Sequence, residues 1–488
     1  MRLAYDTLIE ARDAIRRNEV SATELTRDAI ARIKKYDPQI RAFNSYDEER
    51  AIERANAVDN GQVTGELAGV PIALKDNLCT SWGTTTCSSK MLADFRSPYD
   101  ATVVKKLEAA GAIIVGKTNL DEFAMGSSTE NSAFGATRNP WDTDRIPGGS
   151  SGGSAAALAA GMCCAAIGSD TGGSIRQPAA LTGLVGLKPT YGRVSRYGLV
   201  AFASSLDQVG PFGWTVADVA LLMNVISGHD PKDSTSVAHA VPDHLADLDR
   251  PLEGLRVGIV KEYDLGTGID PEVRAAVDAA VAKYRELGAT IVDVSLPTTE
   301  YGIAAYYVIA PCEASSNLAR YDGVHFGHRT KEPVNDIVEL FSKSRAEGFG
   351  PEVQRRIMIG TYALSSGYYD AYYVRALQLR TLIRRDFDKA FGQCDAILCP
   401  TSPIPAFRVG EKSGDPLQMY LCDVFTVTCN IAGIAGLSLP CGFTGGAKPL
   451  PIGLQLLGAN FSEAKLLRIA RMYEGATDWH RRRPALQE

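Results

Sequence analysis

Two short segments of the chain combine glycine with serine, and both could place a reactive hydroxyl beside exposed backbone N–H groups. Residues 148–154 read GGSSGGS, and residues 168–174 read GSDTGGS. Glycine lets a ligand approach the backbone, and a helix predicted after each segment would add positive potential at its N-terminus. Such a site suits an anion or a developing oxyanion. The candidate nucleophiles or proton relays are Ser150, Ser151, Ser154, Ser169 and Ser174.

A serine nucleophile needs a base, and no histidine lies near these segments. The first histidine of the chain is His229, so a lysine is the next candidate. Lys75 directly follows the apolar run of residues 70–74, which predicts a buried strand. Burial would lower the pKa of its ammonium group and supply a neutral amine. Taken singly, Lys75 also fits a snorkelling or ion-paired lysine, and Ser150 or Ser174 fits a helix cap.

The order and context of Lys75, Ser150 and Ser174 resemble the amidase signature family, serine hydrolases with a Ser–Ser–Lys triad. Residues 148–189 contain GGSSGGS, GSDTGGSIRQPA and GLVGLKPT and are similar to the signature block of that family. The resemblance extends over nearly the whole chain. It implies an α/β fold in which helices cover both faces of a central mixed β-sheet, with a helical insertion.

The resemblance also implies roles for these residues. Neutral Lys75 accepts the proton of Ser150, and Ser150 accepts the proton of the nucleophile Ser174. In the family an unusual cis peptide bond precedes the serine that corresponds to Ser150. The oxyanion hole would consist of the backbone amides of Thr171, Gly172, Gly173 and Ser174.

Within the family the resemblance is strongest to the glutamine-hydrolysing subunits of tRNA-dependent amidotransferases. It implies that the chain releases ammonia from glutamine for a partner that activates glutamyl-tRNA with ATP. It further implies a heterotrimer with two other subunits and tRNA contacts made mainly through the partner. No cofactor is expected on this chain, and ATP and Mg are expected on the partner subunit.

The same resemblance implies a glutamine pocket that contains Tyr307, Arg356 and Asp423. Arg356 would bind the α-carboxylate of glutamine in bidentate fashion, and Asp423 would bind its α-ammonium group. Arg355 is adjacent in the sequence and stays an alternative ligand for the carboxylate. From the residues alone, Arg356 fits an exposed helix position and Asp423 fits a cap.

Composition favours a protein of the reducing cytoplasm. The net charge of −6 and the pI near 5.7 argue against extensive direct phosphate binding. None of the ten cysteines forms a Cys-x-x-Cys pair, and no Cys/His group has zinc spacing, so no metal site is predicted. No signal or transit peptide and no membrane span is predicted.

Short apolar runs alternate with helical patterns over much of the chain, which favours an α/β sheet. Residues 155–167 are expected to form a buried helix, and Gly168 is expected to lie in a loop. The strand signals stop between residues 301 and 391. We therefore predict a single domain over residues 1–488. It comprises N-terminal helices at 1–60, a catalytic core at 61–300, a helical insertion at 301–391 and a return to the core at 392–488.

Two motifs favour other chemistry. Residues 111–118 match the Walker A expression GxxxxGK[ST], but the residues between the two glycines read as a strand and cannot also form a phosphate-binding loop. Residues 148–152 match the G-x-S-x-G nucleophile elbow, which would make Ser150 the nucleophile. The elbow needs a preceding strand and a supporting histidine, and the sequence offers neither.

Two other functions stay open at this point. A free-standing amidase would use the same triad on a small or aryl amide and differ only in its pocket. A non-catalytic scaffold would keep the fold without the chemistry, and the presence of Lys75, Ser150 and Ser174 argues against it. Co-purification with two other chains would distinguish a dedicated subunit from an autonomous amidase.

Overall fold

The computed structural model describes residue 5 and residues 7–486, so the outermost ends of the predicted single domain lie outside the described residues. In this part of the chain, one mixed sheet contains 11 strands. In sheet order they are β1 (Phe43–Tyr46), β3 (Ile113–Thr118), β2 (Pro71–Lys75), β4 (Ala165–Asp170), β6 (Gln208–Gly213), β5 (Val185–Lys188), β10 (Ala435–Phe443), β11 (Pro451–Gly458), β9 (Ala396–Pro400), β7 (Arg256–Val260) and β8 (Thr290–Val294).

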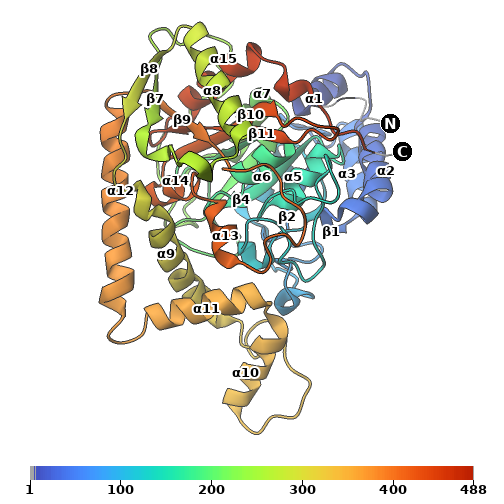
Figure 1. Cartoon of the computed structure of the whole chain (residues 1–488). Helices are drawn as coiled ribbons and strands as arrows, with labels where there is room; N and C mark the ends of the chain where they lie inside the picture. The colour runs from blue at the N-terminus through green and yellow to red at the C-terminus, as the bar shows by residue number, and fades with distance from the viewer. Residues whose placement is uncertain (1–4, 6, 487–488) are drawn as a thin grey trace.

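The α-helices surround this sheet (Figure 1). They are α1 (Leu8–Arg16), α2 (Ala22–Ile40), α3 (Glu48–Asp59), α4 (Thr102–Ala109), α5 (Gly152–Ala159), α6 (Arg176–Thr182), α7 (Val216–Ile226), α8 (Pro271–Glu286), α9 (Gly302–Asn317), α10 (Ile337–Gly348), α11 (Pro351–Ala363), α12 (Arg375–Phe391), α13 (Pro416–Leu421), α14 (Val427–Ala432) and α15 (Glu463–Gly475). Together with the sheet they confirm the predicted α/β fold.

Strand pairing brings the three segments of the predicted triad to one region of the sheet. β2 pairs in parallel with both β3 and β4, and β4 continues antiparallel with β6. Lys75 is the last residue of β2, while the second glycine-serine segment begins within β4 and continues past its end at Asp170. The carboxyl ends of adjacent parallel strands meet at one edge, where α/β proteins place their ligands.

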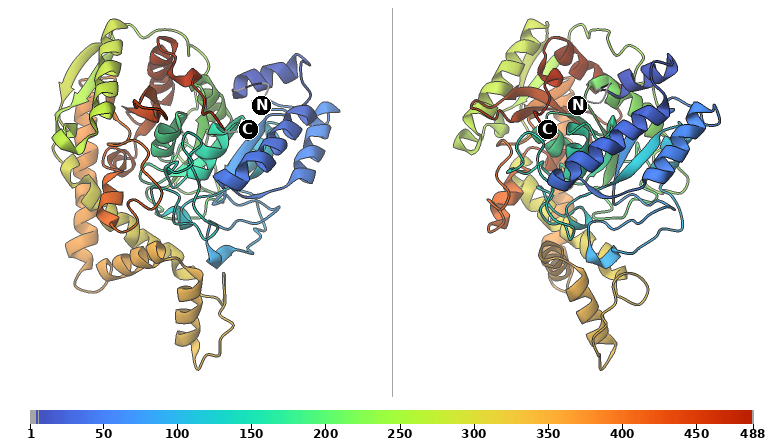
Figure 2. Two further views of the ribbon diagram at one scale, coloured as in Figure 1. Left: turned by 45° about the vertical axis from the view of Figure 1, so that its right-hand side comes forward. Right: turned by 90° about the vertical axis from the view of Figure 1, so that its right-hand side faces the viewer.

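The helices α9 to α12 lie at one side of the molecule, and α10 projects away from the body in all three views (Figures 1 and 2). α9 and α11 pack closely on each other, and α12 runs past α9 to reach α14. This arrangement connects the helical segment to the loops at the sheet edge. None of the described helices is long and apolar enough to cross a membrane.

Local sequence signals fix several helix starts. Ser21 and Glu24 form the predicted capping box at the start of α2, in which each side chain accepts a hydrogen bond from the other residue's backbone N–H. Asp270 caps α8 in front of a proline at the first helical position. All ten cysteines are buried, and none of them forms a disulfide bond with another described residue.

Two local predictions are wrong at the same place. The expected buried helix over residues 155–167 ends at Ala159, because Gly161 takes a left-handed conformation at φ +66° and β4 begins at Ala165. Gly168 lies in β4 rather than in a loop, because the strand continues to Asp170 in register with β6. The loop that precedes Ser174 is therefore shorter than the sequence pattern indicated.

The Walker-like segment is a strand, as predicted. β3 extends from Ile113 to Thr118 and is buried along its whole length. Its Lys117 pairs with the buried carboxylate of Asp76 and hydrogen-bonds to Thr85. With its lysine used in this way, the segment has no loop that could enclose a phosphate.

Candidate active site

Lys75 lies at the centre of a cluster of serine hydroxyls. Its side chain is fully buried, and its Nζ lies 2.8 Å from both Ser150 Oγ and Ser151 Oγ and 2.9 Å from Ser169 Oγ. Ser151 Oγ also donates to the Ser169 carbonyl, and Asn77 donates to Ser169 Oγ. Among the described residues, Ser150 Oγ hydrogen-bonds only to Lys75. Ser150 is therefore the one hydroxyl of the three that has a single hydrogen-bond partner among the described residues.

Burial prepares Lys75 to act as a base. Loss of hydration lowers the pKa of its ammonium group from 10.5 to about 7, although the carboxylates of Asp121, Asp170 and Asp207 act in the opposite direction. A substantial fraction of the side chain is then the neutral amine near neutral pH. A neutral amine has a lone pair that can accept a proton from a neighbouring hydroxyl, and an ammonium group has none.

Asp121 links the loop that contains Ser150 to a neighbouring loop, and its backbone amide donates a hydrogen bond to the Ser150 carbonyl at 3.3 Å. The Asp121 carboxylate accepts hydrogen bonds from the backbone amides of Thr129 and Asn131. The peptide bond between Gly149 and Ser150 is cis. A Cβ atom on Gly149 would collide with the Asp121 carboxylate and lie 2.5 Å from the Ser128 nitrogen, so this position accepts only glycine.

The loop that contains Ser174 is organised by a buried ion pair. Asp170 accepts hydrogen bonds from the backbone amides of Gly173, at 2.8 Å, and Ile175, at 3.1 Å. Arg176 meets the same carboxylate with two nitrogens, each at 3.1 Å. Burial would raise the pKa of Asp170, but the guanidinium outweighs burial and lowers that pKa to about 2. The pair stays ionised and fixes the turn.

Three of the four amides predicted for the oxyanion hole are unengaged. The amides of Thr171, Gly172 and Ser174 donate no hydrogen bond to any described residue, whereas the Gly173 amide is used by Asp170. The Ser174 side chain is 7% exposed, and its hydroxyl makes no hydrogen bond within the described chain. The structure thus places the Ser174 loop beside the cluster without a hydrogen bond between Ser174 and Ser150.

Chain neighbours of the predicted pocket residues pack directly on this loop. Tyr306 contacts Gly172, where an added Cβ would lie 2.6 Å from the tyrosine Cζ. Thr426 donates from Oγ1 to the Gly172 carbonyl at 2.6 Å, and the backbone amide of Thr426 donates to the Asp423 carbonyl at 3.0 Å. Tyr307 and Asp423 therefore belong to segments that form the wall of the same site.

The charges of this wall are buried. Arg356 is 3% exposed, and its guanidinium carbon lies 5.4 Å from the ring centre of Tyr307. Asp423 accepts a 2.5 Å hydrogen bond from Ser127 Oγ. Burial raises the pKa of Asp423 to about 7, against the lowering effects of Ser127 and of the Arg356 charge. The Tyr307 hydroxyl is buried without a partner among the described residues. A buried hydroxyl normally has a partner, so this one is available to a ligand.

The neighbouring Arg355 points elsewhere. Its side chain is 44% exposed and pairs with Glu352 at the surface of α11. Arg356 alone of the two faces the aromatic wall of the site, so the structure favours Arg356 over the alternative.

Several residues around the site were not identified from the sequence. They are Asp121, Ser127, Phe202, Glu352 and Tyr420, all of which contact a predicted site residue or the loop that positions one. Some of their partners lie far away in the chain: Ser127 reaches Asp423 across 296 positions, and no local pattern could have indicated that contact. Glu352 is the exception, because its partner Arg356 lies four positions later on the same helix. Within the described chain no group of three or more His, Cys, Asp or Glu side chains could hold a metal.

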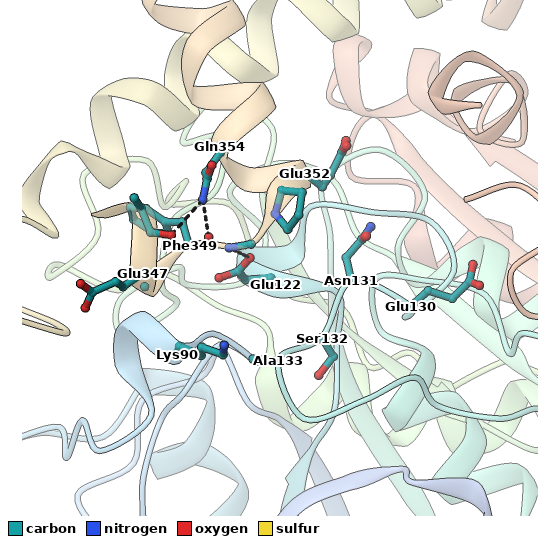
Figure 3. A pocket seen from close by; sticks show the side chains of 14 residues that line it. Lys90, Glu122, Glu130, Asn131, Ser132, Ala133, Glu347, Phe349, Glu352 and Gln354 are labelled. Carbon is teal, nitrogen blue, oxygen red and sulfur yellow. Dashed lines mark hydrogen bonds between the residues drawn. The ribbon is translucent and has the colours of Figure 1, made fainter. Parts of the chain in front are cut away.

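A cavity of about 540 Å³ lies beyond this wall, between the core and the α10–α11 junction (Figure 3). Glu122 lines it and accepts hydrogen bonds from Ser89 and from the Gly350 amide at 2.8 Å. Burial raises the pKa of Glu122 to about 7. Glu352 also lines the cavity, and its side chain points away from Glu122.

Comparison with known proteins agrees with this geometry. The family profile described as Amidase matches residues 24–467. The chain belongs to the amidase family. It is 58% identical to the glutamyl-tRNA(Gln) amidotransferase A subunit of Moorella thermoacetica over 490 residues, which covers 100% of this chain and 99% of the relative. The relative of the same name from Carboxydothermus hydrogenoformans is 56% identical, with 100% of both chains covered.

Solved structures agree with the fold. The crystal structure of the glutamyl-tRNA(Gln) amidotransferase A subunit from Thermotoga maritima matches with a TM-score of 0.81 and 43% identity, covering 99% of this chain and 98% of that one. The peptide amidase from Stenotrophomonas maltophilia matches with a TM-score of 0.82 and 31% identity over 99% of both chains. These likenesses confirm the family and the fold predicted from the sequence.

Proposed function

We propose that this chain is the glutamine-hydrolysing subunit of a tRNA-dependent amidotransferase that converts Glu-tRNA(Gln) to Gln-tRNA(Gln) with ATP. The observation that supports it most directly is the pair of buried opposite charges, Arg356 and Asp423, on the wall of the serine loop. A free amino acid substrate carries a carboxylate and an ammonium group that need such partners. The names of the full-length relatives support the same proposal.

The reaction begins with proton transfer through the serine cluster. Neutral Lys75 accepts the proton of Ser150, which accepts the proton of Ser174, and Ser174 Oγ forms a bond to the side-chain amide carbon of glutamine. The free amides of the loop at residues 171–174 bind the oxyanion. When the intermediate collapses, the C–N bond breaks and the relay returns a proton to the departing ammonia. Water then cleaves the acyl ester, which releases glutamate and restores the Ser174 hydroxyl.

In this proposal the other parts of the overall reaction belong to partner chains. Two further subunits complete a heterotrimer in the cytoplasm, and one of them binds ATP, Mg and the tRNA. The acidic net charge of −6 supports a division of labour in which this chain does not hold the RNA itself. The test is ammonia release from glutamine, with and without the co-purified subunits and charged tRNA. Isolation of the active chain alone, with no dependence on partners, would favour a free-standing amidase instead.

The charged side chains of Arg356 and Asp423 should be needed for hydrolysis of glutamine and not for hydrolysis of amides that lack α-groups. Arg356→Ala or Asp423→Ala is expected to lower kcat/KM for glutamine by tens- to thousands-fold, because loss of a desolvated charge contact commonly costs about 2–5 kcal/mol. A simple aliphatic amide without α-groups should be hydrolysed as before, since the serine cluster is untouched. Arg355→Ala is the matched control and should change neither rate. Equal losses for both amides would indicate a folding defect, and unchanged glutamine hydrolysis would contradict the roles proposed for Arg356 and Asp423 in binding the α-groups.

The pH profile should depend on the substrate. The active form needs neutral Lys75, so activity on an uncharged amide should rise with pH and level off above about 7. Glutamine also needs ionised Asp423, whose pKa is also about 7. Below both pKa values, kcat/KM for glutamine should therefore fall about 100-fold per pH unit, against about tenfold for the uncharged amide. Parallel profiles for the two substrates would contradict a role for Asp423 in binding the ammonium group.

A further inference from the structure

Glu352 hydrogen-bonds to two residues of the pocket wall, Arg356 and Tyr420. It lies in the first turn of α11, four positions before Arg356. Its Oε1 accepts hydrogen bonds from Arg356 Nε at 2.8 Å and from the Tyr420 hydroxyl at 3.1 Å. Its Oε2 pairs with Arg355 on the outer side. One carboxylate thus joins α11 to the α13 segment that precedes Asp423.

The guanidinium of Arg356 is enclosed on the remaining sides by aromatic rings. Its carbon lies 5.4 to 5.6 Å from the ring centres of Phe202, Tyr307 and Tyr420. Tyr307 and Tyr420 are themselves stacked, with ring centres 3.8 Å apart. Rings cover a guanidinium by cation–π contact and leave its N–H edges for hydrogen bonding.

The Nη edge of the Arg356 guanidinium is the edge that no described residue occupies. The Nε edge is bound to Glu352, while Nη1 and Nη2 make no hydrogen bond with any described residue. Two parallel N–H groups at that end match the two oxygens of a carboxylate. Without Glu352, the long arginine side chain would have other rotamers available, and the Nη edge would lose its fixed direction.

We infer that Glu352, together with the Tyr420 hydroxyl that it binds, is a positioning residue for Arg356 and sets the preference of the site for amides that carry an α-carboxylate. This inference rests on the proposed function, because it assigns the free edge of Arg356 to the carboxylate of glutamine. Glu352 itself touches no reacting atom. A merely structural role is the competing explanation, since an acidic residue in the first turn also stabilises a helix.

The side chain of Glu352 can be altered without filling or emptying a tightly packed core. It borders the cavity of about 540 Å³ on one side and the exposed Arg355 on the other. Glu352→Gln keeps one oxygen that can accept from Arg356 Nε, removes the charge and replaces the second oxygen with an NH₂ donor. Glu352→Ala removes both acceptors. Arg355→Ala removes the outer partner of Glu352 and leaves the inner contacts in place, so it serves as the matched control.

The experiment measures KM and kcat for glutamine and for a simple aliphatic amide, with the full chain assembled with its co-purified subunits. Glu352→Ala should raise KM for glutamine about tenfold or more and leave its kcat within about twofold, because a contact made equally in ground and transition states affects KM alone. Glu352→Gln should recover most of this loss. Arg355→Ala should leave both constants for both amides within about twofold.

The same measurements on the Arg356→Ala variant distinguish failure of the inference from failure of the proposed function. If Arg356→Ala impairs glutamine hydrolysis and Glu352→Ala does not, the positioning role is wrong while the proposed function stands. If Glu352→Ala lowers kcat for both amides equally, Glu352 is only structural, and the inference is overturned. If Arg356→Ala leaves glutamine hydrolysis unchanged, the carboxylate contact is absent and the inference falls, whereas the proposed function falls only if the parent enzyme releases no ammonia from glutamine.

Discussion

Replacement of Ser174 by alanine is expected to abolish glutamine hydrolysis. In the proposed mechanism, Ser174 Oγ forms the bond to the substrate carbon, and no other group can replace it. Removal of a nucleophile of this kind typically lowers kcat by several orders of magnitude, on the order of 10⁶-fold in a serine hydrolase. Ammonia release measured in the assembled enzyme should fall to the background rate.

The fold should survive this substitution. The Ser174 hydroxyl makes no hydrogen bond within the described chain, so its loss should change the free energy of unfolding by less than about 0.5 kcal/mol. Thermal unfolding of the variant therefore serves as the control. In the parent enzyme, an acyl adduct should be found by mass spectrometry on the peptide that contains Ser174. An adduct on Ser150 would instead support the nucleophile elbow and contradict the proposed roles.

Strands with a strong apolar pattern were predictable from the sequence. The run at residues 290–294 coincides with β8, and the run before Lys75 lies within one residue of β2. Three strands beside the site were missed: β4, whose residues were expected to form helix and loop, and also β6 and β5. β6 contains two glycines and a proline, and β5 is four residues long. Both form because they complete the sheet between β4 and β10, and a local sequence window does not contain that information.

Some residues of the site could be predicted from the sequence, and others could not. Lys75, Ser150 and Ser174 stand in a motif, and the structure brings Ser150 to 2.8 Å from the amine. Their catalytic roles stay predictions until they are measured. Glu352 and Tyr420 have no motif, because their importance comes only from the position of Arg356 between them. Tyr420 reaches Glu352 from a separate element, so only the folded chain reveals that contact, whereas Glu352 and Arg356 lie four positions apart on α11.

The lysine prediction distinguishes a base from a fixed positive charge. Lys75→Arg is expected to impair hydrolysis nearly as severely as Lys75→Ala, by about 10²- to 10⁴-fold, which is the usual contribution of a general base. Arginine keeps the positive charge but does not deprotonate at working pH. It therefore cannot accept the proton of Ser150. The measurement is kcat for glutamine and for an uncharged amide, and both should fall, because the base acts on the enzyme's own serine.

A small added amine provides the positive control for that loss. Lys75→Ala leaves an empty space where a fully buried Nζ stood within 2.9 Å of three serine hydroxyls. A neutral alkylamine of suitable length can occupy that space and accept the proton of Ser150, so it should restore part of the activity of the alanine variant. The arginine variant has no such space and should not respond. Rescue should increase with pH as more of the added amine becomes neutral. If Lys75→Arg keeps substantial activity, Lys75 acts only through its charge, and the proton relay from Ser174 must end at another group.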